Sequence, residues 1–151
     1  MTDSTDVLLM LWKDQREQVR QGEIQRAALT NIVIIVAAAG LGFVARRGRP
    51  DFDDLCVSVP MLLLGVYGSL TCWKYRERNS HHGSQMSRLY VAIADLHPSL
   101  ELARIKSEGH ARHDARFPRT VKIRLYALWM ALHIGVALGG AALSAWILVS
   151  R

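Results

Sequence analysis

The stretch AALTNIVIIVAAAGLGFVA, residues 27–45, contains no Asp, Glu, Lys or Arg over 19 consecutive positions. At about 1.5 Å of rise per residue, a helix of this length reaches roughly the 30 Å thickness of the hydrocarbon core of a bilayer. A surface helix of a soluble protein carries charged residues on one face and is rarely uncharged over such a length. The stretch therefore predicts a membrane-spanning helix.

Two further windows share this composition: LCVSVPMLLLGVYGSLTCW at 55–73 and an uncharged run at 125–150. The alternative is a soluble helical bundle, which would have to cover all three windows with other helices. A chain of 151 residues has no shell large enough to do so. The sequence thus predicts an all-α integral membrane protein, a single membrane domain over 1–151, with three transmembrane helices at about 27–45, 55–73 and 125–149.

A helix with an apolar stripe is expected before the first span. Within residues 7–26, Leu8, Leu11 and Trp12 recur at helical spacing with charged residues between them. Residues 1–26 are too long and too mixed in charge to be the short basic start of a signal peptide. We expect an N-terminal amphipathic helix, 1–26, on the cytoplasmic side, which runs with little break into the first span.

The distribution of Lys and Arg predicts the orientation. Four precede the first span, three lie between spans one and two, eleven lie in 74–124 and one is at the C-terminus. Regions rich in these residues stay on the cytoplasmic side. The segment 46–54 contains Gly48 and Pro50, so spans one and two are expected to form a tight transmembrane hairpin, 27–73. We expect a plasma (inner) membrane protein with its N-terminus in the cytoplasm and its C-terminus outside.

Basic residues flank the predicted spans on the cytoplasmic side, where anionic headgroups attract each of them by about 1 kcal/mol. The expected lipid-headgroup contacts are Arg26, Lys74, Arg76, Arg78, Lys122 and Arg124. Lipid attraction accounts for the net charge of +6, and the sequence has no nucleic-acid-binding motif. The expected partners are therefore an anionic lipid bilayer, further copies of the chain and a cytoplasmic protein, but no nucleic acid.

The basic cytoplasmic segment 74–124 is expected to contain several helices. Residues 79–84 are a candidate interruption after span two, and Pro98 is expected to end or kink the helix that follows. Gly109 is a plausible stop for a shorter helix, and Pro118 marks the next boundary. The apolar stripes of these helices need to pack against each other, the N-terminal helix or another subunit.

Small residues crowd the predicted spans, and small residues let helix backbones approach closely. One ridge of span three carries Ala127, Ala131, Gly135 and Gly139. Further candidates for helix packing are Gly140, Ser144, Gly65 and Gly68. The pattern fits contacts between copies of the chain and equally fits packing among the spans of one chain.

His133 is the one ionisable residue well inside a predicted span. Such residues are candidates for function because charge is costly inside a bilayer. On the helix it shares a face with Gly140 and Ser144, so in an oligomer this face could line a pore that His133 would ring. The alternative is a neutral histidine that is hydrogen-bonded to another helix.

The sequence contains no P-loop, no nucleophile elbow and no other catalytic signature. Two histidine pairs, His81-His82 and His110-x-x-His113, are too few for a zinc site, which needs three or four ligands. We therefore expect no enzyme activity, no cofactor and no metal. Whether the cytoplasmic histidines bind a metal ion stays open at this point.

The layout is a lead helix, a tight two-span hairpin and a basic helical segment, and it resembles the SLATT family of small bacterial membrane proteins. Residues 27–102 carry the resemblance, particularly the run KYRER at 74–78, which leaves the second span. The resemblance implies a membrane effector of a nucleotide-signal conflict system, thought to form pores. The third span, at 125–149, departs from the two-span pattern of that family.

Two functions from different classes follow. The first is a self-associating small membrane protein, a pore- or channel-like effector module gated by a cytoplasmic signal or partner that docks on helices 83–108. The second is a non-conducting membrane scaffold or anchor that recruits a cytoplasmic partner protein. The position of the helix face that carries His133 distinguishes the pore from the scaffold. A pore needs this face at an axis shared by several copies, whereas a scaffold buries it within one subunit.

Overall fold

The computed structural model describes residues 3–49 and 51–150, and within these ranges it is built of helices without strands. The helices are α1 (Ser4–Arg46), η1 (Phe52–Asp54), α2 (Leu55–Leu96), η2 (Pro98–Leu100), α3 (Leu102–Arg116), η3 (Thr120–Lys122) and α4 (Leu125–Val149). The elements labelled η are single turns of 3-10 helix. The all-α prediction is confirmed.

Three of these helices are long and apolar enough to cross a membrane, as the sequence predicts. They are α1, α2 together with the short η1 before it, and α4, and each contains one of the uncharged windows. A helix can span a bilayer because its backbone hydrogen bonds are all satisfied within the segment. The span-length helices are thus established by length and composition.

The chain divides into two compact units. The apolar unit comprises Ile24–Tyr75 and Leu125–Arg151, and the polar unit comprises Met1–Glu23 and Arg76–Arg124. All three uncharged windows fall in the apolar unit, whereas most charged residues fall in the polar unit. Because α1 and α2 each contribute to both units, segments far apart in the sequence build each of them.

Both long helices are continuous. α1 is unbroken over its whole length, so the expected passage of the lead helix into the first apolar window is confirmed. α2 also continues through 79–84, so the interruption considered there is wrong. The glycine in that stretch, Gly83, costs only about 1 kcal/mol relative to alanine inside a helix, which weakens a helix without ending it.

Proline and glycine have different effects at the later boundaries. α2 stops at Leu96 and η2 begins at Pro98, which confirms the boundary expected there. α3 continues through Gly109, so the stop expected at this glycine is wrong. It ends at Arg116, shortly before Pro118, because a proline disfavours the helical conformation of the residue before it.

A buried acid holds the turn between α1 and α2. Asp54 is fully buried; one carboxylate oxygen accepts from the N–H of Asp51 at 2.9 Å and the other pairs with Arg47 at 3.2 Å. Asp51 in turn accepts from the N–H of Phe52 and caps η1. Gly48 has a φ of 74°, which glycine adopts without steric cost. The tight turn expected here is confirmed.

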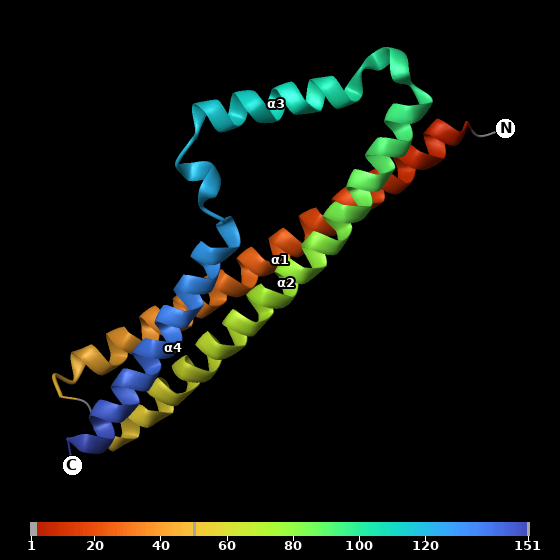
Figure 1. Ribbon diagram of the computed structural model, residues 1–151. Coiled ribbons are helices and arrows are strands. Elements are labelled where there is room, and N and C mark those ends of the chain that lie inside the picture. The colour runs from red at the N-terminus through yellow and green to blue at the C-terminus, as the bar shows by residue number, and fades with distance from the viewer. Residues whose placement is uncertain (1–2, 50, 151) are drawn as a thin grey trace. The chain divides into compact units, whose positions relative to one another are not determined.

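The apolar unit buries several polar side chains beside its apolar core and exposes many large apolar side chains. Thr30, Ser58 and His133 are fully buried, whereas Ile35 and Leu138 expose 66% and 64% of their surfaces. Figure 1 shows the orange part of α1, the yellow part of α2 and the blue α4 side by side. A surface of this kind suits lipid better than water, because soluble proteins rarely expose contiguous apolar patches of such extent.

Polar side chains join α1 to α2 in the polar unit. Arg78 donates to the Gln18 side-chain oxygen at 2.8 Å, and His82 Nδ1 lies 2.7 Å from Oε1 of Gln15. An amide oxygen only accepts, so Nδ1 of His82 carries the hydrogen. Near the end of α2, His97 Nε2 lies 3.0 Å from the hydroxyl of Thr5. The two helix parts, red and green in Figure 1, therefore pair along their length.

Candidate functional site

Helices α2 and α4 approach closely at small residues. A Cβ added at Gly65 would lie 2.3 Å from the backbone nitrogen of Ala137, and one added at Gly140 would lie 2.5 Å from that of Leu62. No side chain larger than hydrogen fits at either position without moving a backbone. Two of the candidates from the sequence, Gly65 and Gly140, thus pack within one chain.

Ser144 makes a hydrogen bond across the same interface. Its Oγ lies 2.8 Å from Oγ of Ser58 and 2.9 Å from the carbonyl oxygen of Gly140. Ser58 is fully buried, where a hydroxyl without a partner would be costly. Ser58 was not among the packing residues predicted from the sequence. The sequence feature that could have indicated Ser58 is its hydroxyl within the uncharged window 55–73. Such a hydroxyl can face the small residues of the window 125–150.

His133 is fully buried in the apolar unit. Its Nε2 lies 3.1 Å from Oγ1 of Thr30, and its ring packs on Gly68, where an added Cβ would lie 2.2 Å from Nδ1. The Thr30 hydroxyl donates to the carbonyl of Arg26 at 2.9 Å. In that arrangement the Thr30 oxygen accepts from Nε2–H of His133, and Nδ1 has no partner. The geometry is that of a histidine hydrogen-bonded to another helix of the same chain.

A second set of small residues on α4 faces away from the other helices. We call it the outer ridge, and its members Ala127, Ala131, Gly135 and Gly139 are all exposed. A Cβ added at Gly135 or at Gly139 would meet no atom within 4 Å. The small residues of α4 therefore separate into an inner set packed on α2 and an outer ridge that no described part of the chain covers.

The basic residues expected at lipid headgroups differ in exposure. Those with exposed side chains are Lys74, Arg76, Lys122 and Arg124. Arg78 is partly buried by its hydrogen bond to Gln18. Arg26 keeps only 7% of its surface exposed, and its guanidinium carbon lies 5.5 Å from the centroid of the Trp129 ring. Arg26 is thus part of the helix packing and not a freely exposed surface cation.

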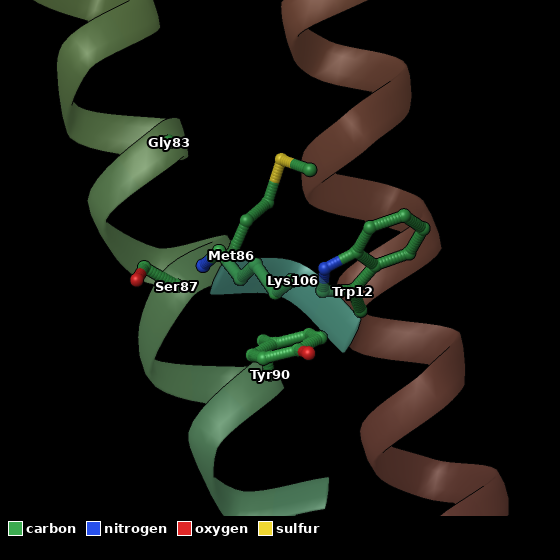
Figure 2. A pocket seen from close by; sticks show the side chains of 6 residues that line it. All are labelled: Trp12, Gly83, Met86, Ser87, Tyr90 and Lys106. Atoms are coloured by element: carbon green, nitrogen blue, oxygen red, sulfur yellow. The ribbon is translucent and has the colours of Figure 1, made fainter. Parts of the chain in front are cut away.

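The polar unit contains a pocket of about 340 Å³, within the usual size range of ligand sites. Its lining residues are Trp12, Gly83, Met86, Ser87, Tyr90 and Lys106. Figure 2 shows the side chains of Trp12, Tyr90 and Lys106 converging from α1, α2 and α3. Lys106 Nζ lies 4.5 Å from the centroid of the Tyr90 ring, and the Tyr90 hydroxyl donates to the carbonyl of Leu102. These contacts tie α3 to α2.

The pocket combines aromatic and apolar walls with one ammonium group, and no acid lines it. Such a lining suits a group that is apolar or planar and also carries negative charge. The sequence predicts docking on residues 83–108, and Trp12 lies outside that range. The apolar stripe of the lead helix was the available signal, because it places Trp12 on a face that needs a partner.

Within residues 3–49 and 51–150, no group of three or more His, Cys, Asp or Glu side chains is placed to hold a metal ion. The histidines of the two sequence pairs have other neighbours. His82 contacts Gln15, and the ring of His113 lies 5.2 Å from that of Phe117. His82 and His113 thus have hydrogen-bonding and packing roles, respectively.

Comparisons with protein-family models, with curated protein sequences and with solved structures found no match. The resemblance to the SLATT family therefore stays a prediction from the layout of the sequence.

Proposed function

We propose that this chain is a self-associating membrane scaffold, in which copies meet at the outer ridge of α4 and the polar unit binds a cytoplasmic signal or partner protein. The observation that carries the proposal is the outer ridge itself. Small residues in a span serve the close approach of another helix, and the chain's own described helices do not cover these. Leucine or isoleucine would meet lipid equally well, so small residues at every fourth position favour a second helix there.

Membrane placement is supported by the outward apolar surface of the apolar unit. The orientation rests on the distribution of basic residues, eleven of which lie in 74–124 against three in 46–54. With that segment in the cytoplasm, the polar unit lies inside, and the turn at 46–54 and the C-terminus lie outside. An integral protein of the plasma membrane is the placement that agrees with both features.

The pocket at Trp12, Tyr90 and Lys106 is the proposed docking place for the cytoplasmic partner. A ligand with an acidic group would attract the ammonium of Lys106 away from the ring of Tyr90. Because this contact helps tie α3 to α2, binding would change how firmly α3 is held. Ligand binding in the pocket would thereby alter the packing of α3 against α2 within the polar unit.

The buried His133 supports the scaffold over the channel form. A channel needs polar side chains along a shared axis, and His133 and Ser144 make their hydrogen bonds inside one chain. The outer ridge itself has only alanine and glycine, without a hydroxyl or a charge. Copies packed along this ridge would form a dry contact and not a water-filled pore.

The double substitution Gly135→Leu and Gly139→Leu tests the proposal in lipid vesicles that contain two fluorescently labelled populations of the chain. Energy transfer between the labels reports association, and we expect it to weaken by about tenfold, because leucine holds the helix backbones apart. Gly42→Leu is the matched control. Gly42 also lies in an uncharged window with no atom within 4 Å of an added Cβ, so its substitution is expected to leave association unchanged.

Equal weakening by Gly42→Leu, or a wild-type chain that stays monomeric, would contradict self-association through the outer ridge. The same vesicles, loaded with an ion-sensitive dye, separate the scaffold from the channel. We expect no ion leak above that of protein-free vesicles. A leak that rises with the amount of protein and disappears in the double variant would replace the scaffold with the channel-like effector.

A further inference from the structure

Arg26 is a buried cation, and the acid one turn before it on α1, Glu23, is exposed to solvent. Arg26 is 7% exposed, and its Nε has no hydrogen-bond acceptor. The acids of the apolar unit are Asp51, Asp53 and Asp54, all of them in or next to η1. The 20 residues of helix from Arg26 to Arg46 place these acids about 30 Å away along α1. These three acids are therefore too far away to neutralise Arg26, and burying a charge without a buried partner is costly.

The Trp129 ring beside Arg26 also lacks a hydrogen-bond acceptor. Nε1 of Trp129 is buried without a hydrogen-bond partner, and the ring centroid lies 5.5 Å from the guanidinium carbon of Arg26. Both Arg and Trp side chains only donate hydrogen bonds. Two unsatisfied donor groups, one of them charged, thus come from α1 and α4 to one place. Their shared requirement is an acceptor that carries negative charge.

We propose that Arg26 and Trp129 form a binding site for the phosphate of one anionic phospholipid headgroup. Arg26 directly precedes the first uncharged window and Trp129 lies in the first turns of α4, which is the depth at which headgroups meet a span. A phosphodiester supplies several acceptor oxygens, and a guanidinium can bind two of them at once. Basic pockets between spans on the cytoplasmic side bind headgroups in this way.

The bound phosphate would join α1 to α4 at the same end of the apolar unit as the contact of Thr30 with His133. Thr30 lies one turn after Arg26 and donates to its carbonyl, so the two contacts share one stretch of α1. A saturable site of this kind differs from the general attraction of lipid to exposed cations such as Lys74. It does not depend on self-association through the outer ridge.

Native mass spectrometry of the full chain in mild detergent, titrated with phosphatidylglycerol, tests the site. We expect one lipid per chain to bind saturably, and Arg26→Gln to weaken this binding by about tenfold. Trp129→Phe keeps an aromatic ring and removes only the N–H donor, so it is expected to weaken binding severalfold. Arg46→Gln is the matched control, because Arg46 is exposed at the C-terminal end of the same helix, 20 residues after Arg26, and binding should stay unchanged.

The far-UV helix signal of each variant verifies folding, and Trp129→Phe keeps the test decisive should Arg26→Gln not fold. Equal lipid binding by wild type, Arg26→Gln and Trp129→Phe, or equal loss in Arg46→Gln, would overturn the site in favour of general charge attraction. Inorganic phosphate serves as the competing probe. Displacement of phosphatidylglycerol by millimolar inorganic phosphate would overturn the lipid assignment and leave a free-phosphate site, whereas retention of the lipid supports it.

Discussion

Single residues decide how the helices of the apolar unit meet. The ring of His133 fits between Thr30 and Gly68 because Gly68 has no side chain, and the hydroxyl of Thr30 gives the ring a partner. Polar contacts of this kind between spans are worth about 0.6 kcal/mol on average. Their larger effect is specificity, because only one rotation of α4 brings His133 to Thr30.

Gly68→Ala is expected to destabilise the chain, because the added Cβ would lie 2.2 Å from Nδ1 of His133 and force the ring away from Thr30. Overpacking of this kind costs about 1–3 kcal/mol. Gly42→Ala is the control, since nothing lies within 4 Å of its added Cβ and alanine is the better helix former. Thermal unfolding in detergent, followed by circular dichroism, should give a lower Tm for Gly68→Ala only. Equal Tm values would show that His133 moves aside without cost.

At the level of the helices, the sequence correctly predicted the features that depend on local composition alone, namely the three span-length helices and the boundary at Pro98. The uncharged windows give the three span-length helices, because the absence of charge over such a length is visible without any neighbour. The boundary at Pro98 was also predictable, because proline has no backbone N–H to donate and its ring clashes with the preceding helical turn. The helix stop predicted at Gly109 is wrong. A single glycine only weakens a helix, and α3 continues through it to Arg116.

The sequence did not predict the use of each helix face, because a face acquires its role from other helices. The period of α4 indicates two small-residue ridges, but only the rotation of α4 against α2 makes Gly140 an inner residue and Gly139 an outer one. The same holds for His133, whose two interpretations differ only in that rotation. The pocket at Trp12 and Lys106 joins residues from three helices, so no single stretch of sequence contains it.

Gly109→Ala is expected to stabilise α3, because Gly109 lies inside this exposed helix and an added Cβ would meet no atom within 4 Å. The gain should be about 1 kcal/mol, and Gly109→Pro should instead break the helix at a cost of about 3 kcal/mol. Hydrogen exchange of the peptide that covers 102–116, read by mass spectrometry, should slow in the alanine variant and speed up in the proline variant. Exchange that is unchanged by both would show that the helix ends at Gly109 in solution.

On the scale of the whole molecule, charge and apolar surface are segregated between the two units. The apolar unit exposes large apolar side chains, and its acids are confined to η1 and the residue before it, whereas the polar unit carries ten of the eleven basic residues of 74–124. A bilayer accommodates both, since its core takes the apolar surface and its anionic inner leaflet attracts the basic segment. The segregation therefore supports the proposed placement in a membrane and the orientation proposed with it.

The orientation predicts which side of the membrane each unit meets, and single cysteines can report it. Cys56 is replaced by serine as background, and Cys72 is kept because it is fully buried. In intact expressing cells, a membrane-impermeant maleimide should label Arg49→Cys in the outer turn, whereas Ala111→Cys in α3 should react only after permeabilisation. Both positions are exposed, so a difference between them reports the side and not burial.

Removing Arg49 lowers the basic count of the outer turn, so this substitution cannot itself reverse the predicted orientation. Labelling of Ala111→Cys in intact cells with protection of Arg49→Cys would place the polar unit outside and contradict the orientation.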